Sequence, residues 1–289
     1  MSARQAHTRF AVWLGPAILL AALLWSYWPT VVSLAREWDR DEDYSVGMLV
    51  PVAALYLLWT ERHRLAALTP RICWWGIGVI LVAQAARAYG LVFLFESAER
   101  YSFVLTIVGL VLLMAGWPVF RGVGWILAFL FLMIPLPGRV HNAIASPLQT
   151  MATVGAVHTL ELLGVTVERE GNTMRLNGQV SVAVAEACSG LRMLTAFVVV
   201  AATLAYVVNR PGWQKAGLLL SSVPVAIVCN LVRLVVTAGL FLYADAEIAQ
   251  RFFHDLAGWT LMPLAVLMLM GELWLFSKLV VPDTPNSKP

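Results

Sequence analysis

Residues 215–243 read KAGLLLSSVPVAIVCNLVRLVVTAGLFLY, and the only charged residue after Lys215 in this stretch is Arg233. The run is mostly apolar and exceeds the roughly 20 residues that an α-helix needs to cross a bilayer. Asn230 lies three residues before Arg233, so the two share one face of a helix. The stretch therefore predicts a membrane-spanning helix that holds polar groups at depth, and we expect Pro224 to kink it.

The whole chain has the same apolar character. Of its 289 residues, 60% are hydrophobic and only 13% are charged, and the mean hydropathy is +0.76. A soluble domain usually has about a quarter of its residues charged, so the bilayer must be the main solvent. We predict an all-α polytopic membrane protein with about eight transmembrane helices, forming one integral-membrane domain over residues 1–289 with a short polar tail at 282–289. The predicted spans are 10–32, 45–60, 73–95, 102–117, 122–137, 189–208, 215–243 and 256–278.

Lys and Arg residues in the loops set the orientation, because cytoplasmic loops carry an excess of them. If the N-terminus is cytoplasmic and eight helices alternate, most loop cations fall on the cytoplasmic side, and the acidic clusters at 37–43, 96–99 and 245–247 fall on the other. We therefore expect both termini in the cytoplasm. The net charge of +3 does not indicate nucleic-acid binding, since the basic residues occupy short loops between apolar runs. The cytoplasmic cations are Arg4, Arg9, Arg62, Arg64, Arg71, Arg121, Arg210, Lys215, Lys278 and Lys288.

Two segments depart from the pattern of spans. Residues 141–163 are moderately apolar but contain several polar groups, and a ninth span here would place Arg210 and Lys215 outside. We therefore favour an amphipathic or re-entrant helix on the outer face. Residues 165–187 alternate apolar and polar side chains and contain Gly171-Asn172 and Asn177-Gly178, which predicts a short β-ribbon with tight turns. Because open strand edges are not tolerated in hydrocarbon, we place this ribbon on the extracytoplasmic surface.

The sequence that joins the ribbon to the sixth span has features of a reactive site. A cysteine at a helix N-terminus is close to the positive end of the helix dipole, which favours the nucleophilic thiolate. Gly190 allows another backbone to approach closely, and Arg192 adds positive charge. The alternative is a small residue at an ordinary helix start. The segment comprises Glu186, Ala187, Cys188, Ser189, Gly190, Leu191 and Arg192.

Two further residues fall on the same outer half of the membrane in this topology. Arg233 lies at depth in the seventh span, where an ionisable group is functional by default, although a structural arginine bonded to helix carbonyls is the alternative. His254 opens the last span, and an imidazole can act as acid or base near neutral pH. A solvated interfacial histidine is the alternative there. Because three separate helices bring Cys188, Arg233 and His254 to one face, we predict that they act together.

The sequence contains no motif of a metal site or of a phosphate-binding loop. HExxH and CxxC are absent, and the histidines lack metal-ligand spacing. We therefore expect no metal and no cofactor. Arg87 with Gln84 lies toward the outer end of the third span, where pairing with Glu96 or Glu99 is the simplest explanation.

At these residues the chain resembles the bacterial exosortases of the exosortase/archaeosortase family. The resemblance rests on the block at 186–192, on Asn230-Leu-Val-Arg233, on His254 and on Met133-Ile-Pro-Leu-Pro137. It implies that Cys188 is the nucleophile, that Arg233 stabilises the oxyanion or donates a proton, and that His254 is the general acid/base.

The resemblance also implies the substrates and the setting. These substrates are exported proteins with a C-terminal Pro-Glu-Pro motif, a transmembrane helix and a basic tail. The implied partners are membrane lipids and a lipid or glycan that accepts the cleaved protein. The implied process is protein sorting linked to exopolysaccharide. The setting is the bacterial inner membrane, with the active site on the periplasmic face. The substrate glutamate needs a cationic partner, for which Arg87, Arg139 and Arg192 are candidates.

Two other classes of function are open on the sequence. A transporter or channel could line a solute path with Arg87 and Arg233, but it predicts paired broken helices in inverted halves, and the sequence shows no such symmetry. A non-catalytic scaffold of exopolysaccharide export predicts that replacing Cys188 has no effect.

Overall fold

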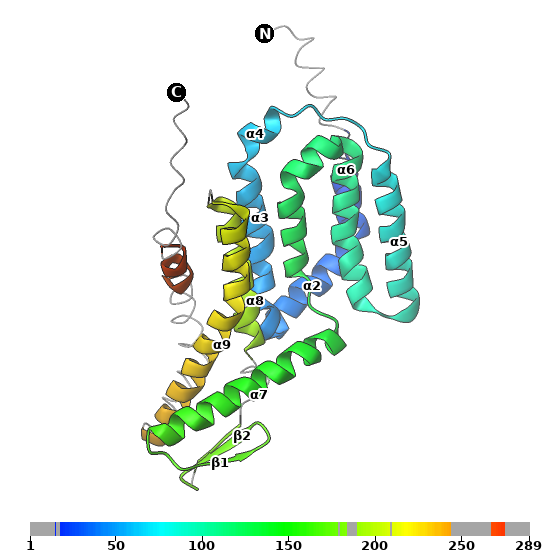
Figure 1. Ribbon diagram of the computed structural model, residues 1–289. Coiled ribbons are helices and arrows are strands. Elements are labelled where there is room, and N and C mark those ends of the chain that lie inside the picture. The colour runs from blue at the N-terminus through cyan, green and yellow to red at the C-terminus, as the bar shows by residue number, and fades with distance from the viewer. Residues whose placement is uncertain are drawn as a thin grey trace, which may run out of the picture. The chain divides into compact units, whose positions relative to one another are not determined.

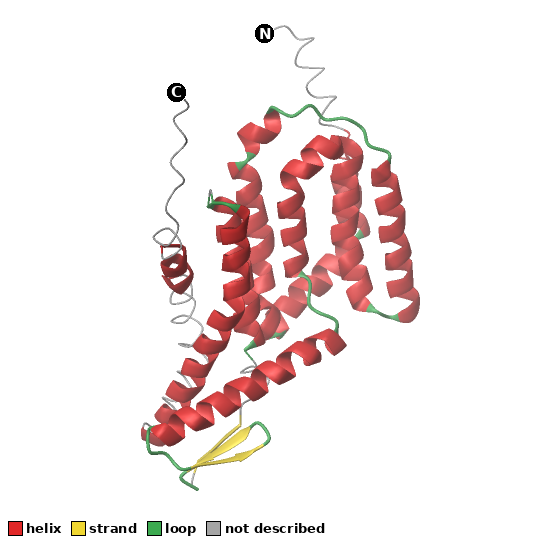
Figure 2. Ribbon diagram, in the orientation of Figure 1, coloured by secondary structure: helices red, strands yellow, loops and turns green. Residues whose placement is uncertain are grey.

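The computed structural model describes residues 15, 18–178, 180–183, 190–208, 210–243 and 267–274. The described part is mostly helical with one small sheet (Figure 2). The chain divides into two compact units, Met1–Leu136 and Pro137–Pro289. The first holds α2 (Trp28–Arg40), the 3-10 helix η1 (Glu42–Met48), α3 (Leu49–Thr60), α4 (Arg62–Ala66), α5 (Trp75–Phe93), α6 (Glu96–Phe129) and η2 (Leu130–Met133). The second holds α7 (Gly138–Leu162), β1 (Val167–Glu170), β2 (Thr173–Leu176), β3 (Val180–Ala183), α8 (Leu191–Val207) and α9 (Gly212–Tyr243).

In the first unit α6 is a helical hairpin rather than one straight helix. Gly116 has non-helical backbone angles (φ 75°, ψ −176°), and the chain reverses there so that the two arms of α6 lie side by side (Figure 1). The extended segment before α5 covers the end of the first arm, because the amides of Arg71 and Cys73 donate to the carbonyls of Ala115 and Leu113 (3.3 and 3.1 Å). The predicted spans 102–117 and 122–137 thus correspond to the two arms of α6.

The first predicted span is broken. The helix Ile18–Ser26 and α2 meet at an angle of 62°, and α2 continues to Arg40, well beyond the predicted end at residue 32. Pro29 stands in the first turn of α2, where a proline is tolerated because no intrahelical amide bond is needed. The break follows from this proline, since its ring cannot continue the preceding helix.

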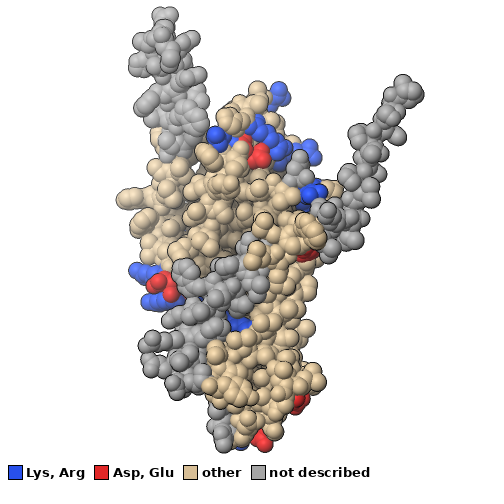
Figure 3. Space-filling model, turned by 90° about the vertical axis from the view of Figure 1, so that its left-hand side faces the viewer, with Lys and Arg blue, Asp and Glu red and all other residues tan. Residues whose placement is uncertain are grey.

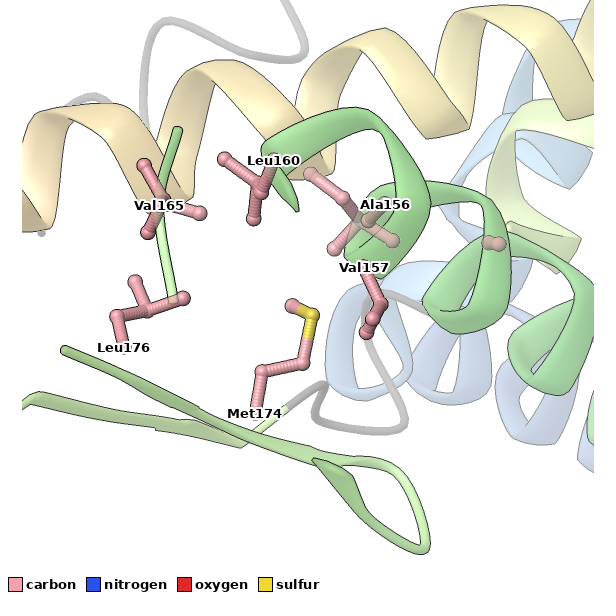
Figure 4. Packing of buried hydrophobic residues seen from close by; sticks show 9 residues of the cluster. Ala156, Val157, Leu160, Val165, Met174 and Leu176 are labelled. Atoms are coloured by element: carbon pink, nitrogen blue, oxygen red, sulfur yellow. The ribbon is translucent and has the colours of Figure 1, made fainter. Parts of the chain in front are cut away.

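The small sheet of the second unit packs against α7 and α9. The strands are antiparallel in the order β1-β2-β3, and Met174 of β2 faces Arg169 of β1 and Val182 of β3. Met174 and Leu176 are fully buried, and their side chains point toward α7 (Figure 4). The cluster consists of Ala152, Ala156, Val157, Leu160, Val165, Met174, Leu176, Leu234 and Ala238. This confirms the predicted β-ribbon, and it shows that the ribbon is held by an apolar face of α7.

The turns of the sheet follow the predicted chemistry. Asn177 and Gly178 both have positive φ (49° and 67°) in the turn between β2 and β3. Gly171 also has positive φ (61°) in the turn between β1 and β2. α7 contains nearly all of residues 141–163, which were expected to form an outer helix. It is not among the helices that are long and apolar enough to cross a membrane.

Within the described residues four helical stretches could cross a membrane, or five if the bent pair at the N-terminal side counts as one span. The count falls below the predicted eight for identifiable reasons. The two arms of α6 are counted together with η2, α8 has only 17 residues, and the last predicted span is described only at 267–274.

Large apolar side chains are exposed on these helices, and most of the visible face carries neither basic nor acidic residues (Figure 3). Such a surface suits a bilayer and would be unstable in water. α9 continues through Pro224 as one helix that bends along its length (Figure 1).

Candidate functional site

The start of α8 lies directly against α9. Gly190 is the N-cap residue of α8 with φ 82°, and a Cβ added to it would lie 2.8 Å from Nδ2 of Asn230. Asn230 is only 2% exposed. The sequence predicted close approach of a backbone at Gly190, and the structure instead shows a side-chain amide there. Two segments that the sequence singled out, 40 residues apart in the chain, are therefore in contact.

A small pocket opens at this contact. Its volume is only about 10 Å³, about the space that one water molecule needs and far below the usual size of a small-molecule site. The walls are mostly apolar, and Asn230 supplies the polar side chain. The lining residues are Leu148, Ala152, Gly190, Leu194, Ala226, Ile227 and Asn230.

Arg233 extends the polar face of α9 by one helical turn. The side chain is only 8% exposed, and Asn230 and Thr237 are buried on the same face of the helix. A buried guanidinium in a membrane helix is costly, so such residues are kept where they bind or react. In the first turn of α8, Arg192 is half-buried. The second unit thus brings Gly190, Arg192, Asn230 and Arg233 onto two helices that pack together.

Arg87 has local partners in the first unit. Its guanidinium donates to the hydroxyl and the carbonyl of Ser26 (2.6 and 2.5 Å) and lies 4.2 Å from the ring centre of Tyr27. The carbonyl of Ser26 is at the break of the first span, so Arg87 stabilises that bend. The expected pairing with Glu96 or Glu99 is wrong, because both hydrogen bonds of Arg87 go to Ser26 and Glu96 accepts from Arg100 at 2.6 Å.

Arg139 lies near the start of α7 in the second unit and is exposed. Four other residues that the sequence singled out, Glu186, Cys188, Ser189 and His254, lie outside the described residues. Within the part of the chain that the structure describes, no group of three or more His, Cys, Asp or Glu could hold a metal ion.

Sequence reasoning missed the contribution of α7. Leu148 and Ala152 form part of the pocket wall, although α7 was expected only as an outer helix. No sequence signal identifies them, because small and apolar residues recur throughout the chain. The only hint was the position of α7 immediately before the ribbon.

Comparison with protein families identifies the family to which the chain belongs. The family described as "Transmembrane exosortase (Exosortase_EpsH)" matches residues 38–271, which is well over half of the chain. The matched range contains the block at 186–192, Asn230, Arg233 and His254. No curated protein and no solved structure matches the chain. The match over this length, across the contact between Gly190 and Asn230, shows that the chain belongs to the transmembrane exosortase family.

Proposed function

We propose that the protein is a membrane-embedded cysteine protease or transpeptidase that cleaves the C-terminal sorting signals of exported proteins. Membership of the exosortase family supports a membrane enzyme of this class. The observation that carries the proposal is the contact between Gly190 and Asn230, which joins the cysteine-containing block to the helix that bears the buried Arg233.

Chain connectivity strengthens this link. Cys188 precedes Gly190 by two residues, so their Cα atoms can be at most about 7 Å apart. Arg233 is three residues from Asn230 on α9, a rise of about 4.5 Å along the helix. This connectivity supports a shared site in which the Cys188 thiol and the Arg233 guanidinium would act on one scissile bond.

The proposed reaction has two steps. The Cys188 thiolate attacks the scissile carbonyl carbon, and the carbonyl oxygen takes up negative charge that Arg233 stabilises in a low-dielectric site. The intermediate collapses to a thioester, the C–N bond breaks, and His254 gives its proton to the departing amine. In the second step an acceptor nucleophile loses a proton to His254, attacks the thioester and releases the Cys188 thiolate. The acceptor is water or a hydroxyl or amine of a lipid or glycan.

The proposed substrates are exported proteins with a Pro-Glu-Pro motif, a transmembrane helix and a basic tail, in connection with exopolysaccharide. The substrate glutamate would pair with a cation near the site. Of the three candidates, Arg139 and Arg192 belong to the same unit as Gly190 and Asn230. Arg87 belongs to the first unit and is engaged by Ser26 and Tyr27, which makes it the weakest candidate.

We further propose an eight-span arrangement in the bacterial inner membrane, with both termini cytoplasmic and the active site on the periplasmic face. The distribution of loop charges supports it, since the acidic clusters then face outward. In this arrangement the sheet of the second unit covers the periplasmic side, where its strand edges can be hydrated.

Co-expression with a reporter that ends in such a tripartite tail tests the proposed function. Cys188→Ala, Arg233→Ala and His254→Ala should each reduce tail cleavage at least about 100-fold. Cys73→Ala is the matched control, because it removes a thiol of the first unit that has no part in the reaction. Processing at the wild-type rate by Cys188→Ala would eliminate the enzyme assignment.

A further inference from the structure

Glu272 has no part in the proposed reaction, and its position calls for a physical explanation. Residues 267–274 read LMLMGELW and form a helical segment in which Glu272 is the only charged residue. An ionisable side chain in an apolar membrane segment is costly unless it has a polar partner. The partner of Glu272 therefore indicates why a carboxyl group is kept there.

The partner is a serine of α9. The hydroxyl of Ser221 donates to Oε2 of Glu272 at 2.5 Å. Apolar packing surrounds this hydrogen bond, since Leu269 is fully buried in a cluster with residues of α8 and α9. The buried members of this cluster are Ala201, Ala205, Leu218 and Leu269.

A second contact shows how the segment runs along α9. Sγ of Cys229 lies 3.6 Å from Sδ of Met268. Cys229 and Ser221 follow each other toward the start of α9, while their partners Met268 and Glu272 follow each other toward the end of the segment. The segment is therefore antiparallel to α9, and it contacts α9 at the residue next to Asn230.

Apolar contacts alone cannot fix the rotation of a membrane helix, because lipid tails are as apolar as leucine side chains. A hydrogen bond between two helices is directional, so it selects one rotation and one register. Shifting a helix by a single residue turns its side chains by about 100°. The Ser221–Glu272 hydrogen bond is thus the contact that distinguishes one orientation of the segment on α9 from the next.

We propose that Glu272 is a positioning residue that acts through Ser221. Their hydrogen bond fixes residues 267–274 against α9 beside Cys229, and so holds in place the helix that bears Asn230 and Arg233. The inference rests on the proposed function, because it concerns the placement of the proposed oxyanion-stabilising arginine. Glu272 itself touches neither the substrate nor the reacting atoms.

Kinetics of reporter cleavage by the full-length protein in membranes test the proposal. Glu272→Leu and Ser221→Ala should each lower kcat about fivefold with little change in KM, since interhelical hydrogen bonds in membranes are worth on the order of 1 kcal/mol. Glu272→Gln should retain most of the activity, because its amide oxygen accepts the same hydrogen bond. The double variant should be no slower than Glu272→Leu, as expected for two residues that share one interaction.

Ser222→Ala is the matched control for Ser221→Ala. The Ser222 hydroxyl bonds to the Leu219 carbonyl within α9 (2.6 Å), so its removal should leave kcat unchanged. If Glu272→Leu fails to fold, Ser221→Ala and the Gln variant carry the test. Equal kcat values for Ser221→Ala and Ser222→Ala would overturn the positioning role, and so would a Gln variant as impaired as the Leu variant. Failure of the proposed function is distinguishable, because it requires cleavage to survive Cys188→Ala.

Discussion

Gly190 is the residue at which the site can be tested most selectively. An added Cβ would meet two penalties, a positive φ of 82° and the Asn230 amide at 2.8 Å. A positive φ alone costs a non-glycine residue roughly 1–2 kcal/mol. The steric contact adds a displacement of Asn230, so the two effects need to be separated.

Gly164 provides the control that separates them. It has a similar φ of 86°, and an added Cβ would have no neighbour within 4 Å. We expect Gly190→Ala to slow reporter cleavage about 10- to 100-fold, because displacements of about 1 Å near a reacting group have effects of this size. Gly164→Ala should stay within about twofold of wild type. Equal cleavage rates for the two variants would show that the contact between Gly190 and Asn230 does not affect catalysis.

Residue-level prediction from the sequence succeeded where spacing along one helix was sufficient. The three-residue separation of Asn230 and Arg233 predicted a shared face, and both are buried on α9. The contacts of Gly190 with Asn230 and of Ser221 with Glu272 could not be predicted, because they join residues 40 and 51 positions apart. Such contacts depend on how helices pack, and local pattern does not determine packing.

At the scale of elements, the turn at Gly116 determines the α6 hairpin. Gly116 has a positive φ of 75°, and a Cβ there would collide with the backbone carbonyl oxygen of Arg71. Gly116→Ala should therefore lower the thermal unfolding midpoint of the detergent-solubilised protein by about 5 °C or more, corresponding to a loss of roughly 2 kcal/mol. Tryptophan fluorescence during heating measures this midpoint.

Gly124 in the second arm of α6 is the matched control. An added Cβ would meet nothing within 4 Å, and alanine is the better helix former by up to about 1 kcal/mol. Gly124→Ala should leave the midpoint unchanged or raise it. If Gly116→Ala unfolds at the same temperature as Gly124→Ala, the described turn is wrong.

Sequence-based prediction of the elements worked best where turn chemistry is specific. Asn177-Gly178 predicted a hairpin turn, and both residues have positive φ between the paired strands β2 and β3. Prediction was weaker where apolar runs follow one another, since hydropathy does not show where a helix bends. The break near Pro29 and the extension of α2 to Arg40 were missed for this reason, although the proline was a usable signal.

At the scale of the whole molecule, composition and loop charge carry the assignment to a membrane. Exposed large apolar side chains on α3, α5 and α9 agree with a lipid-facing surface. The proposed catalytic chemistry was inferred from a short motif and two distant residues, and the family match over residues 38–271 supports its class. Composition does not identify the acceptor of the second step, because any nucleophile that reaches the thioester can react with it.

The most direct test of the account is to identify the residue that carries the acyl group during turnover. The wild-type protein and its reporter are mixed, quenched in acid and mapped by mass spectrometry. We predict that the Cys188 peptide bears the acyl fragment of the reporter and loses it on treatment with hydroxylamine, as a thioester does. An acyl fragment on any other residue would contradict the account.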